Sequence, residues 1–348
     1  MPNIIQTLKD KILNAAQTLK KNPTTLIKIL TVLSFIIPFL ILYSLYPESY
    51  EATWKGRTYY LFFIWLVSLE LILSWEKIQT NKLGKLKSTR TIAFIIFLLL
   101  PTLYVVAANY YGLNAMIGDF AEKNNVFWAY EMPLSTEYLV FTALFISIVL
   151  LAYGYEGLMN HSISVIFLGI IGIIYTVDNI YPYGTFTPFQ LLVPTTATLA
   201  ANVLTLMGYQ TEWTGQLFGT PILTVRKPNQ TIGPSFGIAW PCSGIDSLII
   251  YSVTILLFLK DSVISWKQRT AYFLIGAAIT YFINILRIAT IFIIAIDYGA
   301  TSPQVQQFHN YYGPLYSITW ITAYPLIIIG TQALWRKIKS RKIPSKKL

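Results

Sequence analysis

The chain has 348 residues, of which 55% are hydrophobic and only 12% charged; this composition is typical of polytopic helical membrane proteins and argues against a soluble domain. Its single cysteine excludes an intrachain disulfide, and one cysteine with two histidines is too few for a Cys/His metal site, so we expect no metal and no other cofactor. The formal charge of +11 is compatible with a nucleic-acid binder, but the positions of the cations favour a role in membrane orientation, so we expect no nucleic-acid partner.

The first 184 residues predict a basic segment followed by five transmembrane helices. Residues 1–25 combine lysines with spaced Ile and Leu residues, a pattern typical of an amphipathic segment on the inner membrane surface. The five apolar runs that we predict to cross the membrane cover about 26–46, 59–75, 91–110, 138–154 and 162–177. Between the third and fourth runs we expect a loop with four acidic residues: Asp119, Glu122, Glu131 and Glu137.

Residues 185–335 predict an outer-face helix, a β-hairpin and three further membrane helices. Polar residues interrupt the apolar pattern of 189–207, so we predict a helix that lies on or dips into the outer face. In 211–241, apolar residues alternate on both sides of a turn at 227–230, which predicts a short hairpin that leads into the cysteine. Apolar runs at about 244–259, 271–297 and 313–335 bring the predicted count to about eight membrane helices.

The distribution of cations predicts the orientation. Twenty of the 26 Lys and Arg residues fall in the N-terminal segment, after the second and sixth runs, and in the basic tail at 336–348. By the positive-inside rule these segments are cytoplasmic. We therefore predict an all-α, multi-pass protein of the cell membrane with an even number of crossings and both termini in the cytoplasm.

The only cysteine lies in the stretch WPCSGID at 240–246. Ser243 and Asp246 have the spacing of a capping box and precede an apolar run, so we predict that a helix begins here with Cys242 at its N-terminus. Backbone N–H groups and the positive end of the helix dipole would favour the nucleophilic thiolate. The alternative is that Cys242 is a small apolar filler.

Arg287 and His309 are the other rare polar residues near the same predicted membrane face. Arg287 interrupts an apolar helix, where a guanidinium is costly unless it is paired or hydrated, so it marks either a functional site or a buried structural pair. Asn284 lies one turn away and is expected to orient the guanidinium. His309 lies in a predicted outer loop, whereas His161 is predicted to face the cytoplasm, so only His309 can approach the thiol.

These residues together predict a cysteine acyl-transfer site. Cys242 would be the nucleophile, His309 the general acid and base, and Arg287 the donor that binds the oxyanion or the substrate carbonyl. Ser243 and Asn284 would support them.

The order Cys242-Ser243-Gly244, then Asn284-x-x-Arg287, then His309 with Gly313, resembles the exosortase and archaeosortase family of integral membrane cysteine transpeptidases. The resemblance covers about residues 185–335. It implies a thiol protease on the outer face that removes C-terminal sorting signals from exported surface proteins, each signal made of a Pro-containing motif, a transmembrane helix and a basic cluster. It also implies transfer of the acyl-enzyme to a lipid-like acceptor, and it matches Cys242, Arg287 and His309 to the family's catalytic residues.

Two other functions remain open. A transporter could use Arg287 and Glu70 as intramembrane polar contacts, although we find no internal repeat relating the two halves. A membrane scaffold would need no reaction at all. We expect the Glu70 carboxylate to extend to the cytoplasmic interface and Asp178 to be solvated at an outer helix end. The oligomeric state is not predicted.

Overall fold

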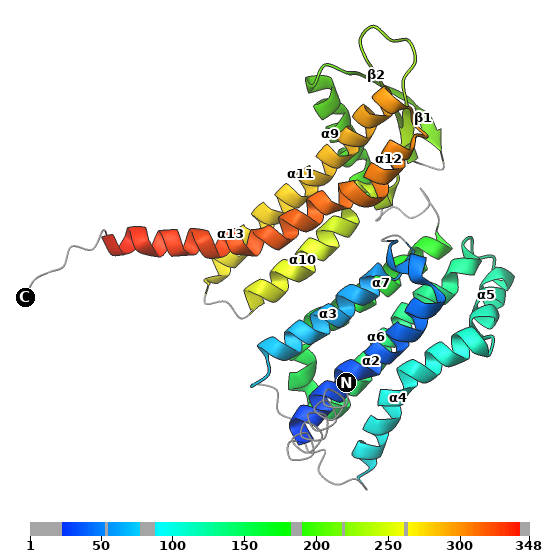
Figure 1. Ribbon diagram of the computed structural model, residues 1–348, viewed down its shortest axis with the longest axis vertical. Coiled ribbons are helices and arrows are strands. Elements are labelled where there is room, and N and C mark those ends of the chain that lie inside the picture. Colours follow the sequence, from blue (N-terminus) through cyan, green and yellow to red (C-terminus); the bar gives the residue numbers. More distant parts are fainter. Residues whose placement is uncertain are drawn as a thin grey trace, which may run out of the picture. The chain divides into compact units, whose positions relative to one another are not determined.

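The computed structural model describes residues 23–52, 55–76, 88–181, 190–217, 220–260 and 264–341. The described chain is mostly helical with one small sheet, and it divides into two units, Met1–Ile180 and Tyr181–Leu348 (Figure 1). Most of the predicted amphipathic segment at 1–25, the cations at 77–87 and the end of the basic tail lie outside the described residues.

Among the described residues, six helical stretches are long and apolar enough to span a membrane: Thr24–Leu45, Thr89–Tyr110, Ala129–Asn160, Ser162–Ile180, Trp266–Tyr298 and Pro303–Trp335. The predicted second and sixth runs are also helices, α3 (Thr58–Leu73) and α10 (Ile245–Lys260), but each has only 16 residues. A helix of this length rises ~24 Å, less than the ~30 Å of a typical hydrocarbon core. The chain is therefore a multi-pass membrane protein, and the count of eight crossings stays a prediction.

The first unit packs five long helices around an aromatic core. These are α2 (Pro23–Leu45), α3, α4 (Thr89–Tyr110), α6 (Met132–Asn160) and α7 (Ser162–Ile180). The ring of Phe35 lies edge-on to three buried rings at centroid separations of 5.2 to 5.9 Å, those of Phe63, Phe141 and Phe145. Edge-to-face contacts of this kind add about 0.5–1.5 kcal/mol per pair to the gain from burial, so they join α2, α3 and α6 firmly.

Four charged residues of the first unit form two buried ion pairs. Arg57 donates from Nε and Nη2 to the two carboxylate oxygens of Glu137, at 2.8 and 2.9 Å. Lys55 Nζ lies 3.3 Å from Asp178 Oδ2. The expectation that Asp178 is solvated is therefore wrong: it is 1% exposed. Removing one partner of such a pair typically costs about 3–5 kcal/mol, because the other charge stays buried.

The predicted acidic loop after the third membrane run is largely helical, which corrects the expectation from the sequence. It contains α5 (Leu113–Lys123) and the short 3₁₀-helix η2 (Ala129–Glu131), and Glu137 already lies within α6. Gly112, in the left-handed conformation at φ 77°, separates α5 from α4. The sequence carried a signal for this helix, because Leu113, Met116, Ile117 and Phe120 recur at helical spacing, but the prediction weighed only the acidic residues of the segment.

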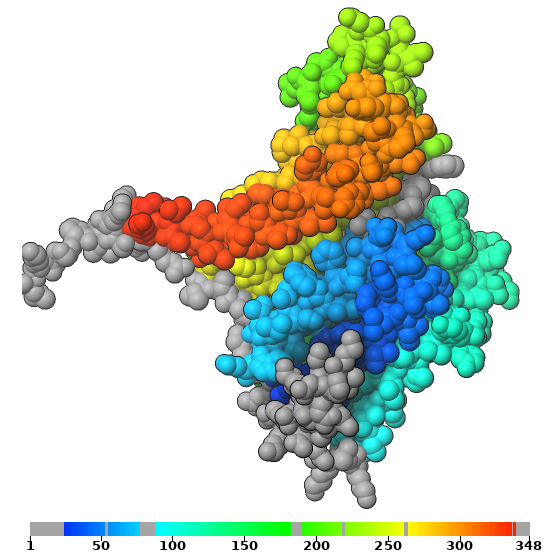
Figure 2. All heavy atoms as spheres, in the orientation of Figure 1, coloured from blue at the N-terminus to red at the C-terminus, as the bar shows by residue number. Residues whose placement is uncertain are grey.

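The second unit places a small α/β cap at one end of a layer of three helices. The cap consists of α9 (Leu192–Leu206), β1 (Gln210–Leu217), β2 (Thr220–Arg226) and β3 (Ser235–Gly237). Figure 1 shows the cap beside the end of α11 (Trp266–Tyr298), with α10 and α13 (Gly313–Arg341) lying along α11. The last turns of α13 project beyond the other two helices and expose Leu334 and Trp335 (Figure 2).

The predicted hairpin is confirmed as the antiparallel pair β2–β3, with Leu223 opposite Phe236. The first strand, β1, was not anticipated as a partner; it pairs with the other edge of β2 and has a bulge between Trp213 and Gly215. Leu223 and Val225 are fully buried against α9 and α11, as period-two alternation requires for one covered face.

The predicted helix at 189–207 is confirmed as α9, and its small residues explain its close packing. Ala197, Ala200 and Ala201 are buried in one cluster with Ile285 and Ile288 of α11. Small side chains let two helix backbones approach closely. The alignment of α9 with the outer membrane face stays a prediction.

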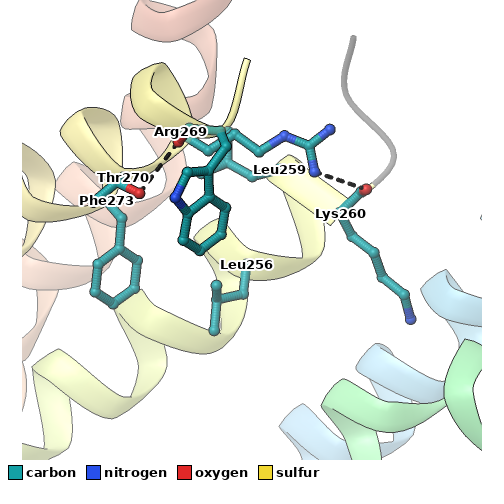
Figure 3. Close-up of a pocket in the computed structure, with 7 residues that line it drawn as sticks. Leu256, Leu259, Lys260, Arg269, Thr270 and Phe273 are labelled. Carbon is teal, nitrogen blue, oxygen red and sulfur yellow. Dashed lines mark hydrogen bonds between the residues drawn. The ribbon is translucent and has the colours of Figure 1, made fainter. Parts of the chain in front are cut away.

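Arg269, in the first turn of α11, contacts the end of α10. Its Nε donates to Ile264 O at 2.9 Å, and its Nη1 lies 3.4 Å from Lys260 O. Figure 3 shows this guanidinium beside a cavity of about 300 Å³ lined mainly by apolar side chains, among them Leu256 and Phe273. These contacts tie the start of α11 to the end of α10 and so help to set the register of the two helices that carry the site.

Candidate active site

Cys242 lies in a single 3₁₀-turn, η3 (Trp240–Ser243), directly before α10. The turn follows extended Ala239, and Cys242 N donates to Ala239 O at 3.0 Å. Gly244 ends it in the left-handed conformation at φ 94°, which L side chains rarely adopt. A Cβ at Gly244 would also lie 3.0 Å from Asn284 Nδ2. Glycine at this position therefore allows both the left-handed backbone conformation and the close approach of α11.

The predicted capping box is wrong in detail. The Ser243 hydroxyl donates to Trp240 O at 2.6 Å, and Ser243 belongs to the 3₁₀-turn. The α-helix begins two residues later, at Ile245. Cys242 therefore precedes α10 but does not occupy its first turn, because the left-handed Gly244 interrupts the helical backbone conformation between them.

Two side chains from other helices bind the carbonyls of this turn. Asn284 Nδ2 of α11 donates to Cys242 O at 2.9 Å, instead of orienting the guanidinium as expected. Thr196 Oγ1 of α9 donates to Ser243 O at 3.1 Å. Thr196 was not among the candidate residues. The sequence offers only a weak signal for it: Thr196 is a polar residue on the same face of α9 as the buried alanines.

His309 lies beside the thiol, in a helical segment instead of the predicted loop. It belongs to η4, a π-helical turn over Phe308–Tyr312 between α12 (Pro303–Gln307) and α13. Such turns are often found at functional sites, because the extra residue shifts one side chain relative to the regular helix. Cys242 Sγ and His309 Nε2 are 3.8 Å apart, within hydrogen-bonding distance for sulfur.

Arg287 completes the group from the side of α11. Its Nη2 donates to His309 O at 2.9 Å, and its Nε has no hydrogen-bond partner among the described residues. A Cβ at Gly313 would lie 2.7 Å from Nε and 2.9 Å from Phe308 O, so a glycine here leaves the room that the guanidinium occupies.

Exposure separates the candidate reactive groups from the groups that hold them. Cys242, Arg287 and His309 are all partly exposed, whereas Thr196 and Asn284 are at most 1% exposed. The three candidate reactive residues therefore reach the surface in part, while the two side chains that support them are shielded from water.

The surroundings of Cys242 favour the thiol at rest, contrary to the expectation from a helix N-terminus. Burial raises the pKa of Cys242, the positive charge of Arg287 lowers it, and the negative charge of Asp246 raises it further, with a net increase. The thiol therefore needs a base to remove its proton, and the nearby His309 imidazole is suitably placed to act as one.

Glu70, which the transporter alternative pairs with Arg287, and the second histidine, His161, both lie in the first unit and have structural contacts. Glu70 is 1% exposed and accepts hydrogen bonds from Ser164 Oγ at 2.6 Å, Ser164 N at 3.0 Å and Ile163 N at 3.2 Å. It therefore caps the N-terminus of α7, and the expected extension to the interface is wrong. His161 is buried and stacks on Tyr153. Among the described residues, no group of three or more His, Cys, Asp and Glu side chains is arranged to hold a metal ion.

Comparison with known proteins gave one family match. The family model described as transmembrane exosortase matches residues 53–326. The matched range extends from the segment before α3 into α13 and contains Cys242, Arg287 and His309. Comparisons with curated proteins and with solved structures returned no match.

Proposed function

Because the chain belongs to the transmembrane exosortase family, which supports a membrane transpeptidase of the sorting-enzyme kind, we propose that it cleaves the C-terminal sorting signals of exported surface proteins with Cys242 as nucleophile. The observation that carries this proposal is the 3.8 Å separation of Cys242 Sγ and His309 Nε2 in a partly exposed site. A thiol beside an imidazole is the arrangement that acyl transfer requires.

The reaction has two halves. In the first, His309 Nε2 takes the thiol proton, Sγ attacks the scissile carbonyl, and the peptide C–N bond breaks as His309 returns the proton to the leaving amine. The product is a thioester on Cys242 and a released C-terminal tail. In the second, a hydroxyl of a lipid-like acceptor, or water, loses its proton to His309 and attacks the thioester. The C–S bond then breaks, and His309 returns the proton to Sγ, which restores the thiol.

Arg287 would stabilise the negative charge that develops on the carbonyl oxygen. Its guanidinium is held beside the thiol through His309 O, and its Nε has no acceptor among the described residues. An arginine keeps its charge in a poorly solvated site, so it stays a donor throughout the reaction.

The proposed substrates reach the site from the outer face. The distribution of cations favours an orientation with Cys242 on that side, where exported proteins would emerge with their tail helix still in the bilayer. Tyr311, Tyr312 and Tyr316 are exposed near His309 on η4 and α13 and offer aromatic surface for an extended peptide.

Replacing the nucleophile tests the proposal. Cys242→Ala should abolish processing of a co-expressed surface protein that carries the tripartite C-terminal signal, with enzyme abundance unchanged on immunoblots. In the wild-type protein, a thioester-linked fragment should be trapped on Cys242 and identified by its mass. Continued processing by the alanine variant would exclude the cysteine mechanism.

A further inference from the structure

The turn that carries Cys242 is held at two adjacent carbonyls by two different helices. Asn284 of α11 binds Cys242 O, and Thr196 of α9 binds Ser243 O. Gly244 interrupts the helical conformation before α10, so helix α10 does not continue back through these two carbonyls. Side chains donate their hydrogen bonds instead. The two contacts fix the plane of the peptide bond on each side of Ser243.

Thr196 is itself oriented by Tyr281. Thr196 Oγ1 and Tyr281 OH are 2.7 Å apart. A threonine hydroxyl has one hydrogen, and Ser243 O can only accept, so Thr196 donates to Ser243 O and Tyr281 donates to Thr196. The hydrogen-bond chain therefore runs in one direction, from Tyr281 through Thr196 to the turn.

Tyr281 belongs to the same face of α11 as the other contacts of the site. It precedes Asn284 by three residues and Arg287 by six, which places all three along one side of the helix. The turn is thus bound by α11 directly through Asn284 and indirectly through Tyr281 and Thr196, with α9 packed against the same helix.

We infer that Thr196 is a positioning residue for the reaction: through Ser243 O it holds the Cys242 turn in the orientation that keeps Sγ within reach of His309. Thr196 does not touch the proposed reacting atoms. Its effect on turnover rests on the proposed function, whereas its effect on the thiol does not.

The test compares Thr196→Val, which keeps the shape of the side chain and removes the hydroxyl, with Thr196→Ser, which restores the hydroxyl. Thr195→Val is the matched control, because Thr195 is an exposed neighbour on the same helix. Since Cys242 is the only cysteine of the chain, labelling of the full-length protein by iodoacetamide in detergent reports on this thiol alone. Its rate is measured across pH, together with the processing of a co-expressed tailed protein.

We expect Thr196→Val to slow processing about tenfold, as for a buried acceptor left without its donor. It should also shift the labelling profile to higher pH, because a displaced Sγ moves away from the guanidinium of Arg287, whose positive charge lowers the pKa of the thiol. Thr196→Ser and Thr195→Val should behave as wild type, and Tyr281→Phe should shift the profile in the same direction by less.

Two results would overturn the inference: wild-type labelling and processing by Thr196→Val, or slow processing with an unchanged labelling profile, which would indicate a general structural effect. If Thr196→Val does not accumulate, the profile of Tyr281→Phe decides in its place. Processing by Cys242→Ala would refute the proposed function and leave the labelling comparison intact.

Discussion

At the scale of single residues, the reactivity of Cys242 depends on opposing influences. Burial and the carboxylate of Asp246 raise the pKa of the thiol, and the guanidinium of Arg287 lowers it. His309 faces the sulfur itself. Because charged neighbours of both signs act on one sulfur, substitutions of opposite sign should move its titration in opposite directions.

We therefore predict the pH dependence of Cys242 labelling. Asp246→Asn removes a negative charge that disfavours the thiolate, so the profile should shift to lower pH. Arg287→Gln removes a positive charge that favours the thiolate, so the profile should shift to higher pH. The measurement is the rate of iodoacetamide labelling of the purified full-length protein between about pH 6 and pH 10, the range in which unperturbed and burial-shifted thiols titrate.

Arg287→Lys is the control for this pair, since it retains the charge and loses the planar donor group. Its labelling profile should stay close to that of the wild type. Shifts of the same sign for Asp246→Asn and Arg287→Gln would contradict the electrostatic account of the site.

At the scale of elements, two interruptions of regular helix shape the site. Gly244 separates η3 from α10, and the π-turn η4 precedes α13. Each interruption presents one candidate reactive side chain, Cys242 in the first and His309 in the second. Arg287 lies on α11, which is continuous, and it donates to His309 O while its charge acts on Cys242.

A substitution at Gly313, the first residue of α13, tests whether the Arg287 side chain needs the room that this glycine leaves. Gly313→Ala should improve local helix propensity by about 1 kcal/mol, yet its Cβ would meet Arg287 Nε at 2.7 Å and Phe308 O at 2.9 Å. We expect Arg287 to be displaced from His309 O and processing of the tailed protein to fall at least about tenfold, the loss that follows from ~1.4 kcal/mol of transition-state stabilisation.

Gly330→Ala in the same helix is the matched control, because nothing lies within 4 Å of the added Cβ. It should leave processing unchanged and should not lower the melting temperature. Equal activity of the two alanine variants would show that the site does not need the space at Gly313.

The elements differ in how far the sequence predicted them. Long apolar runs indicated the membrane helices, and alternation indicated β2 and β3, because both patterns are local. The helix α5 and the pairing of strand β1 were not predicted. The helical spacing of Leu113, Met116, Ile117 and Phe120 in α5 was overlooked, whereas β1 is mostly exposed and has no patterned apolar face. The start of α10 was misplaced, because the Ser243–Asp246 spacing says nothing about the left-handed Gly244 between them.

At the scale of the whole molecule, the distribution of cations predicts the orientation of the chain in the membrane. In a Cys242→Ala background, Asn229→Cys in the β2–β3 connection should react with a membrane-impermeant maleimide in intact cells. Lys267→Cys at the start of α11 should react only after the membrane is opened. Both positions are exposed, so accessibility within the protein does not bias the comparison. The reverse labelling pattern would place the proposed site on the cytoplasmic side.

Composition, apolar runs and the order of three rare polar residues were enough to indicate a multi-pass membrane protein of this family. These features can be read from the sequence because burial in lipid requires long apolar stretches, and charges inside them are costly. They also made Cys242, Arg287 and His309 the candidate site residues, since each stands out chemically from its neighbours in the chain.

The tertiary structure alone decided what each polar group contacts. It assigned Asn284 to Cys242 O, Glu70 to the start of α7, and Thr196 to the turn beside the thiol. It also reversed the expected direction of the Cys242 pKa shift. These contacts join residues 42 to 94 positions apart in the chain. They depend on how the helices pack, and no local pattern of residues encodes that packing.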